Sequence, residues 1–127
     1  MTTKRILIPG PDHPITIEPT AGRVVVTVGG RTVADTKSAL TLREAAYPAV
    51  QYIPRSDVDM SLLDRSKTAS YCPYKGDAAY FSIIVGEDRR PDAIWTYEAA
   101  FPAVAEIESH LAFYPDRVDS IDIKHIG

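Results

Sequence analysis

The densest group of chemically reactive side chains lies in residues 70–76, which read Ser-Tyr-Cys-Pro-Tyr-Lys-Gly. This segment holds the single cysteine of the chain together with two phenols and one amine. Proline and glycine favour turns, so Pro73 and Gly76 predict a turn with Tyr74 and Lys75 at its tip. The segment therefore brings thiol, phenol and amine groups to one loop.

Cys72 is the candidate nucleophile of this loop. An ammonium group near a thiol favours the thiolate, which is the reactive form. One hypothesis is therefore an enzyme in which Cys72 attacks the substrate, Lys75 activates the thiol, and Tyr71 or Tyr74 donates a hydrogen bond. In the alternative interpretation, Cys72 is a small buried hydrophobic residue and Lys75 is a solvated turn residue.

A second candidate site is the acidic pair Asp57 and Asp59. Such pairs hold magnesium in nucleotidyl-transferring enzymes, because hard carboxylate oxygens suit a hard cation. Those enzymes also have a Gly-Gly or Gly-Ser close upstream, whereas Gly29-Gly30 lies far from the pair and is better explained as a hairpin turn. The preferred interpretation is a helix start in which Ser56 is the N-cap and Asp59 reaches back.

The three histidines, His13, His110 and His125, show no metal-binding spacing such as H-x-x-H. The single cysteine excludes a Cys₄ or Cys₂His₂ zinc site within one chain. We therefore expect no metal site and no cofactor.

The chain has 127 residues, with 14 Lys and Arg against 17 Asp and Glu, so its formal net charge is −3. We expect a single domain, residues 1–127, in which residues 1–14 form a proline-rich extended arm. A net negative charge gives no electrostatic attraction to nucleic acid or to an anionic membrane. We see no signal-peptide stretch and no apolar run of membrane-spanning length, and with only one thiol these features predict a cytoplasmic protein.

The patterns predict a mainly β fold with one or two short helices. Strands are expected where β-branched and alternating residues dominate. A charged turn is expected at residues 86–92, and apolar spacing predicts a helix over residues 102–110. The expected strands are residues 15–17, 23–28, 31–36, 38–45 (with a short helix as the alternative), 49–53, 77–85, 93–97, 112–114 and 121–123.

The order of several short motifs resembles a known family. Residues 34–36, 39–40 and 44, followed by Tyr52-Ile53-Pro54, resemble the first half of domain-of-unknown-function family 427. The string Cys-Pro-Tyr-Lys-Gly at residues 72–76 resembles its central signature. Residues 94–97, Pro102 and 112–115 resemble its last third. The resemblance covers about residues 13–123.

This resemblance implies a fold and a set of positions but little function. It implies a β-tent of small antiparallel sheets meeting at an angle, similar to Mss4-like proteins. The family sometimes carries a nucleotidyltransferase-like label, which the residues above do not support. Its recurrent polar and aromatic positions correspond here to Glu44, Tyr52, Asp57, Cys72, Lys75, Trp95 and Tyr97.

Three hypotheses follow. The first is a domain that binds a small molecule or peptide in a pocket walled by Tyr52, Trp95 and Tyr97, with Glu44, Asp57 and Lys75 at its polar end and Tyr74 nearby. The second is the enzyme that uses Cys72, and the third is a structural or partner-binding protein whose edge strands pair in a homodimer. In a further alternative, the polar set is only a structural network.

Overall fold

The structure is a computed structural model, and it describes residues 5–124. Within that range the chain forms ten strands and four short 3₁₀ helices. The strands are β1 (Ile15–Pro19), β2 (Arg23–Val28), β3 (Arg31–Thr36), β4 (Leu40–Glu44), β5 (Val50–Tyr52), β6 (Leu63–Cys72), β7 (Gly76–Val85), β8 (Asp88–Thr96), β9 (Leu111–Phe113) and β10 (Ser120–Lys124). The helices are η1 (Arg55–Asp57), η2 (Met60–Leu62), η3 (Pro102–Ile107) and η4 (Pro115–Arg117).

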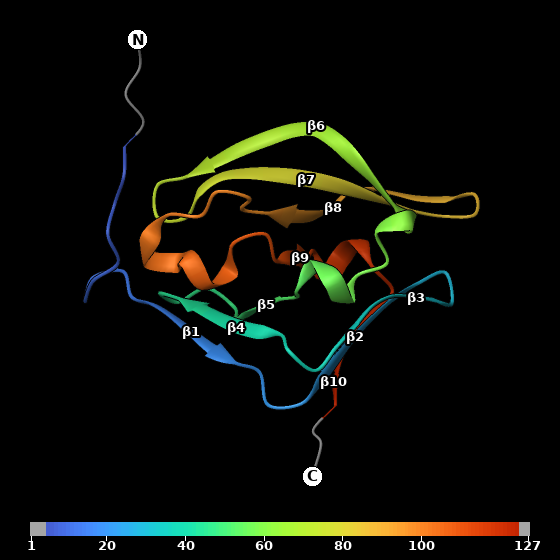
Figure 1. The fold of residues 1–127 in the computed structure, drawn as a ribbon, viewed down its shortest axis with the longest axis horizontal. Helices are drawn as coiled ribbons and strands as arrows, with labels where there is room; N and C mark the ends of the chain where they lie inside the picture. Colours follow the sequence, from blue (N-terminus) through green and yellow to red (C-terminus); the bar gives the residue numbers. More distant parts are fainter. Residues whose placement is uncertain (1–4, 125–127) are drawn as a thin grey trace.

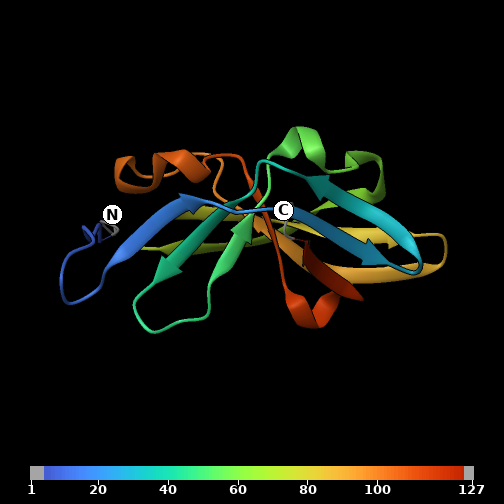
Figure 2. The same ribbon diagram turned by 90° about the horizontal axis from the view of Figure 1, so that it is seen from below.

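The strands form three antiparallel sheets, which confirms the mainly β prediction. A four-stranded sheet has the order β6-β7-β8-β9, and two three-stranded sheets have the orders β1-β4-β5 and β10-β2-β3. Figure 1 shows β6, β7 and β8 of the four-stranded sheet across the top and the two smaller sheets slanting toward each other below. Figure 2 shows the smaller sheets side by side, each over one half of the larger sheet. This arrangement is compatible with the expected β-tent, whereas the likeness to Mss4 stays a prediction.

The β2–β3 hairpin forms as the sequence predicts. Val24, Val26 and Val28 alternate with less buried residues and are each 0% exposed, so one face of β2 enters the core. The turn uses Gly29 and Gly30 at φ 58° and 76°, which is the left-handed backbone that a two-residue hairpin turn of this kind requires.

Each small sheet covers its own cluster of buried side chains on the large sheet. The β10-β2-β3 sheet packs its valines on Phe81, Ile83 and Ile94 of the large sheet. The β1-β4-β5 sheet packs Leu42 and Tyr52 on the other half. Backbone hydrogen bonds in both directions between Ile53 and Leu111, at 2.9 and 2.8 Å, tie the end of β5 to β9.

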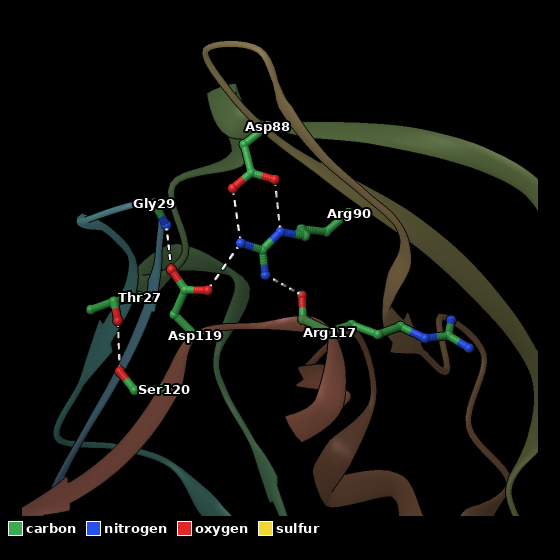
Figure 3. Close-up of polar contacts among 7 residues, drawn as sticks. All are labelled: Thr27, Gly29, Asp88, Arg90, Arg117, Asp119 and Ser120. Carbon is green, nitrogen blue, oxygen red and sulfur yellow. Dashed lines mark hydrogen bonds and ion pairs between the residues drawn. The ribbon is translucent and has the colours of Figure 1, made fainter.

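Arg90 joins three parts of the chain at the end of the molecule near the hairpin turns (Figure 3). Its guanidinium donates twice to Asp88 at 2.8 Å, once to Asp119 at 2.9 Å and once to the carbonyl of Arg117 at 3.3 Å. Asp119 in turn accepts from the amide of Gly29 at 2.7 Å. These charge-assisted contacts hold the β2–β3 turn, the β7–β8 hairpin and the start of β10 together.

The strand β6 was not predicted, because its sequence is polar and mostly exposed. Apolar and polar side chains do not alternate along β6. The strand forms because β7 supplies its backbone hydrogen-bond partners, from the pair Leu63 and Ile83 to the pair Cys72 and Gly76. Its charged residues Arg65 and Lys67 suit an edge strand, since charge discourages pairing with other chains.

The helix predicted at residues 102–110 is wrong in type and length. It is the 3₁₀ helix η3, it ends at Ile107, and Val104 inside it has non-helical angles (φ −127°, ψ 27°). The chain is diverted because the amide of Ser109 donates to the carbonyl of Tyr97 at 2.9 Å and leads directly into β9. Buried Val104 and Ile107 account for the apolar spacing that suggested a longer helix.

Two smaller predictions need correction. The predicted N-cap Ser56 lies inside η1, whose N-cap is Pro54 with no side-chain cap, whereas Asp59 caps η2 by accepting from the amide of Ser61 at 3.2 Å. The charged turn expected over residues 86–92 contains only residues 86 and 87, because β8 begins at Asp88 and pairs with β7.

Candidate functional site

A cavity of about 220 Å³ lies between the β1-β4-β5 sheet and one half of the large sheet. Its walls come from both sheets and from the loops beside them. The lining residues are Leu42, Glu44, Tyr47, Pro48, Val50, Tyr52, Lys75, Tyr80, Trp95, Tyr97 and Tyr114. Five tyrosines and the only tryptophan of the chain make its walls aromatic, and its charged residues are Lys75 and Glu44.

The polar wall of the cavity is an ion pair between Lys75 and Glu44. The ammonium of Lys75 donates to one carboxylate oxygen of Glu44, and the two side chains are only 9% and 14% exposed. Burial pushes the pKa of Glu44 upward, but hydrogen bonds from Lys75 and His13 outweigh burial, so this pKa lies below its ordinary value. Glu44 is therefore a carboxylate at neutral pH, and the pair has no net charge.

Lys75 is buried because the β6–β7 turn is covered by a later loop. Its carbonyl accepts from the amide of Phe101 at 3.0 Å, and its amide donates to the carbonyl of Cys72 at 3.2 Å. Gly76, at φ 114°, allows this approach, since a Cβ there would lie 3.2 Å from the carbonyl oxygen of Ala99. The turn was predicted correctly, but the interpretation of Lys75 as a solvated residue is wrong.

Trp95 is the centre of the aromatic wall. Its indole N–H donates to the hydroxyl of Tyr52 at 3.2 Å, and its ring lies 4.4 Å from the ring of Tyr114 between centroids. Burial raises the pKa values of Tyr52 and Tyr97, and burial together with a hydrogen bond to Tyr80 raises the pKa of Tyr114 to about 12. These phenols remain protonated at neutral pH, so they can donate and accept hydrogen bonds.

His13 holds the other side of Glu44. Its Nε2 donates to the second carboxylate oxygen at 2.7 Å, and its ring stacks on Tyr74 with centroids 4.0 Å apart. Tyr74 therefore supports the histidine rather than lining the cavity. Polar contacts thus connect His13 to Glu44 and Glu44 to Lys75. They extend to Cys72, whose sulfur lies 3.8 Å from the Nζ of Lys75.

Five of the eight residues singled out from the sequence line this cavity: Glu44, Tyr52, Lys75, Trp95 and Tyr97. Cys72 lies beside it and packs with the core cluster under the β1-β4-β5 sheet. Asp57 does not line the cavity. It lies in η1 and accepts a hydrogen bond from the hydroxyl of Thr36 at 2.7 Å. The polar end of the cavity thus consists of Glu44 and Lys75 without Asp57.

Sequence reasoning missed Tyr80 and Tyr114 as lining residues, although strand register contains the signal. Tyr80 is the cross-strand partner of Trp95, and Ala112 is the partner of Trp95 on its other side. Tyr114 follows Ala112 by two residues and so continues on the same side of the chain. The hydrogen bond from His13 to Glu44 joins positions 31 apart, for which the sequence carries no comparable signal.

Among residues 5–124, no group of three or more His, Cys, Asp or Glu side chains is placed to hold a metal ion. His125 lies outside the described residues. In the same part of the chain there is no helix long and apolar enough to cross a membrane, and the cytoplasmic location stays a prediction.

Fold and cavity together define a small mainly β domain with an aromatic pocket and a buried, internally neutralised ion pair in its wall. The chain belongs to the family described as domain of unknown function, DUF427, whose sequence profile matches residues 16–124. This match confirms the resemblance seen in the sequence. A search of curated proteins finds no significant match.

Proposed function

We propose that this domain binds a small molecule or a peptide group in the pocket walled by Trp95 and the tyrosines. The observation that carries the proposal is the Lys75–Glu44 pair in the cavity wall. A buried ion pair costs desolvation energy and is poor evidence for stability alone, whereas charged groups beside a pocket are typical of binding sites.

The chemistry of the pair favours an uncharged polar ligand. Lys75 has three N–H donors, and its hydrogen-bond partners among residues 5–124 are Glu44 and the sulfur of Cys72, so one donor remains for a ligand. The ammonium also lies 5.9 Å from the ring centre of Tyr97. Each carboxylate oxygen of Glu44 has a second lone pair. A primary amide accepts from the ammonium and donates to the carboxylate, while a charged ligand would lose its hydration without meeting a net opposite charge.

The test is a thermal-shift titration with benzamide, benzyl alcohol, benzoate and benzylammonium. We expect benzamide to raise the melting temperature most, because it offers one aromatic ring and both kinds of hydrogen bond. Glu44→Gln should weaken benzamide binding roughly tenfold, since a charge-assisted hydrogen bond is lost. The matched control is Asp57→Asn, a carboxylate outside the cavity, which should leave binding unchanged. Equal shifts for all four compounds would contradict the proposal.

A second candidate function is an enzyme that uses Cys72 as nucleophile. Its support is the 3.8 Å contact between the lysine Nζ and the sulfur of Cys72. Against it, Cys72 does not line the cavity and packs with core residues. The rate of alkylation by iodoacetamide between pH 5 and 9 separates the two: an activated thiol reacts quickly in the folded protein, with a midpoint below about 7. A thiol that reacts only after unfolding removes this candidate.

The third hypothesis, pairing of edge strands in a homodimer, also stays a proposal. The edge strands β6 and β10 have backbone groups on one side that no strand of the described chain covers. Light scattering over a range of protein concentrations tests it, and a constant monomer mass would reject it.

A further inference from the structure

A second, larger cavity of about 950 Å³ runs between the two three-stranded sheets. One side is formed by β1, β4 and β5, and the other side by β2 and β10. Its lining includes the buried Val26, Ile53 and Phe113, whose side chains are at most 4% exposed. Ile123 of β10, which is 44% exposed, lies on the opposite side from Val50. We call this cavity the apolar groove.

The groove contains little that could bind a polar molecule. Its charged lining residues, Glu18 and Arg43, are both exposed. Its other polar side chains include Thr20, Thr41 and Gln51, which already hydrogen-bond to one another. An occupant of the groove is therefore held by burial of apolar surface.

The groove and the polar pocket share part of their walls. Tyr47, Pro48, Val50 and Trp95 line both cavities, so the two adjoin along this row. Trp95 lines the polar pocket, where its indole N–H donates to the hydroxyl of Tyr52, and it also borders the groove. Tyr47, which lines both cavities, is 66% exposed, so this part of the shared wall lies at the surface of the protein.

Neither cavity alone has the properties of a site for a drug-sized molecule. Sites for drug-sized molecules measure about 300–1,000 Å³ and combine mostly apolar walls with a few convergent polar groups. The polar pocket, at about 220 Å³, is too small, and the groove, at about 950 Å³, lacks buried polar groups that are free to bind. Together they provide a polar end and a long apolar body.

We infer that the two cavities form one binding site for a single-chain amphiphile with a small uncharged head, such as an alkyl primary amide. This inference rests on the proposed function, and it adds the apolar tail. The head occupies the pocket beside Lys75 and Glu44, and the alkyl chain passes Trp95 and lies in the groove. The head is uncharged because the ion pair is neutral as a unit, so a charged head would lose its hydration in the pocket without meeting a net opposite charge.

The experiment titrates the full chain with butanamide, hexanamide, octanamide and decanamide and follows the fluorescence of Trp95, the single tryptophan. Each methylene that becomes fully buried should tighten the affinity by about fourfold. Decanoate should bind at least about tenfold more weakly than decanamide, since its charge would be desolvated in a pocket that has no net opposite charge. An affinity that does not change along the amide series, or stronger binding of decanoate, would overturn the inference.

Variants locate the tail. Ile123→Glu puts a charge into the groove and should weaken decanamide binding at least about tenfold while leaving butanamide binding unchanged. Ile8→Glu is the matched control, because Ile8 is an isoleucine exposed by 83% that lines neither cavity. Ala49→Glu, on the other side of the groove, gives a second variant should Ile123→Glu disturb β10.

The outcomes separate the inference from the proposed function. If benzamide and butanamide bind through Glu44 but chain length and Ile123→Glu have no effect, the tail site is wrong and the polar pocket stands. If affinity rises with chain length but Glu44→Gln changes none of the amides, the groove binds apolar chains without the head, and both proposals fail as stated. If no amide binds, both fail.

Discussion

Replacing Lys75 by methionine tests whether the ion pair in the pocket wall is as deeply buried as the structure shows. Methionine keeps an unbranched apolar side chain as far as Cε, with sulfur in place of the Cδ methylene, and it lacks the ammonium. Glu44 then remains as a carboxylate that is 14% exposed, with His13 as its remaining hydrogen-bond partner in the described chain. The variant therefore leaves a buried charge incompletely compensated.

The expected loss can be estimated from these contacts. Removing one partner of a buried pair typically costs about 3–5 kcal/mol. The lower end applies here, because His13 still donates to Glu44 and the cavity beside the pair admits water, so we expect about 3 kcal/mol. For a domain of this size that corresponds to a fall in melting temperature of roughly 12 °C.

Urea unfolding of the variant, followed by circular dichroism, measures this loss. Lys67→Met on β6 is the matched control, because Lys67 is exposed, and it should change the free energy of unfolding by less than about 0.5 kcal/mol. Adding Glu44→Gln to Lys75→Met should restore part of the loss, since the uncompensated charge is removed. If Lys75→Met differs from Lys67→Met by less than about 0.5 kcal/mol, the pair is solvated and the reasoning fails.

The same pair predicts a dependence on pH. The pKa of Glu44 in the folded protein lies below its ordinary value of 4.5. A lowered carboxyl pKa contributes stability at pH values above 4.5, and that stability is lost as the pH falls through the folded value. The difference in unfolding free energy between the wild type and Lys75→Met should therefore be largest near neutral pH and should shrink in acid. A difference that stays constant down to pH 3 would contradict the assignment.

Two further predictions concern the supports of the fold. Gly76→Ala should destabilise the protein by about 1–3 kcal/mol in urea unfolding, because residue 76 has φ 114° and a Cβ would press on the carbonyl of Ala99; Gly10→Ala, where a Cβ meets nothing within 4 Å, should be nearly neutral. Arg90→Met should lower the melting temperature more than Arg89→Met in a thermal-shift assay, because Arg90 links Asp88, Asp119 and the carbonyl of Arg117, whereas Arg89 pairs with exposed Asp64 at 3.6 Å. Equal shifts for the two arginine variants would mean that this link adds nothing.

The strands that could be predicted are those whose own residues carry the signal. Residues 23–36 alternate around Gly29-Gly30, so both strands and their turn are local properties. β6 has no such pattern, and it is a strand only because β7 lies beside it. The broken η3 likewise depends on the hydrogen bond between Ser109 and Tyr97, which apolar spacing cannot reveal.

The candidate site likewise contains some features that the local sequence indicates and others that depend on distant parts of the chain. The turn between β6 and β7 could be recognised from Pro73 and Gly76, and the resemblance pointed to Glu44 and Trp95. The burial of Lys75 could not be predicted, because it depends on the loop at Phe101, 26 positions further along the chain. Tyr80 lies in the site because it is the cross-strand partner of Trp95, and a single sequence does not specify this register.

The position of the ion pair explains why one contact can serve both the fold and the site. Glu44 is the last residue of β4, and Lys75 comes just before β7, so the pair joins the β1-β4-β5 sheet to the large sheet. The backbone bonds between Ile53 and Leu111 form a second connection between the same two sheets. The polar pocket lies along this junction and the apolar groove adjoins the pocket at Trp95, so a ligand that fills both adds apolar contacts there. Glu44→Gln, which keeps the hydrogen-bonding shape, therefore reports on binding, whereas Lys75→Met reports on how the two sheets are joined.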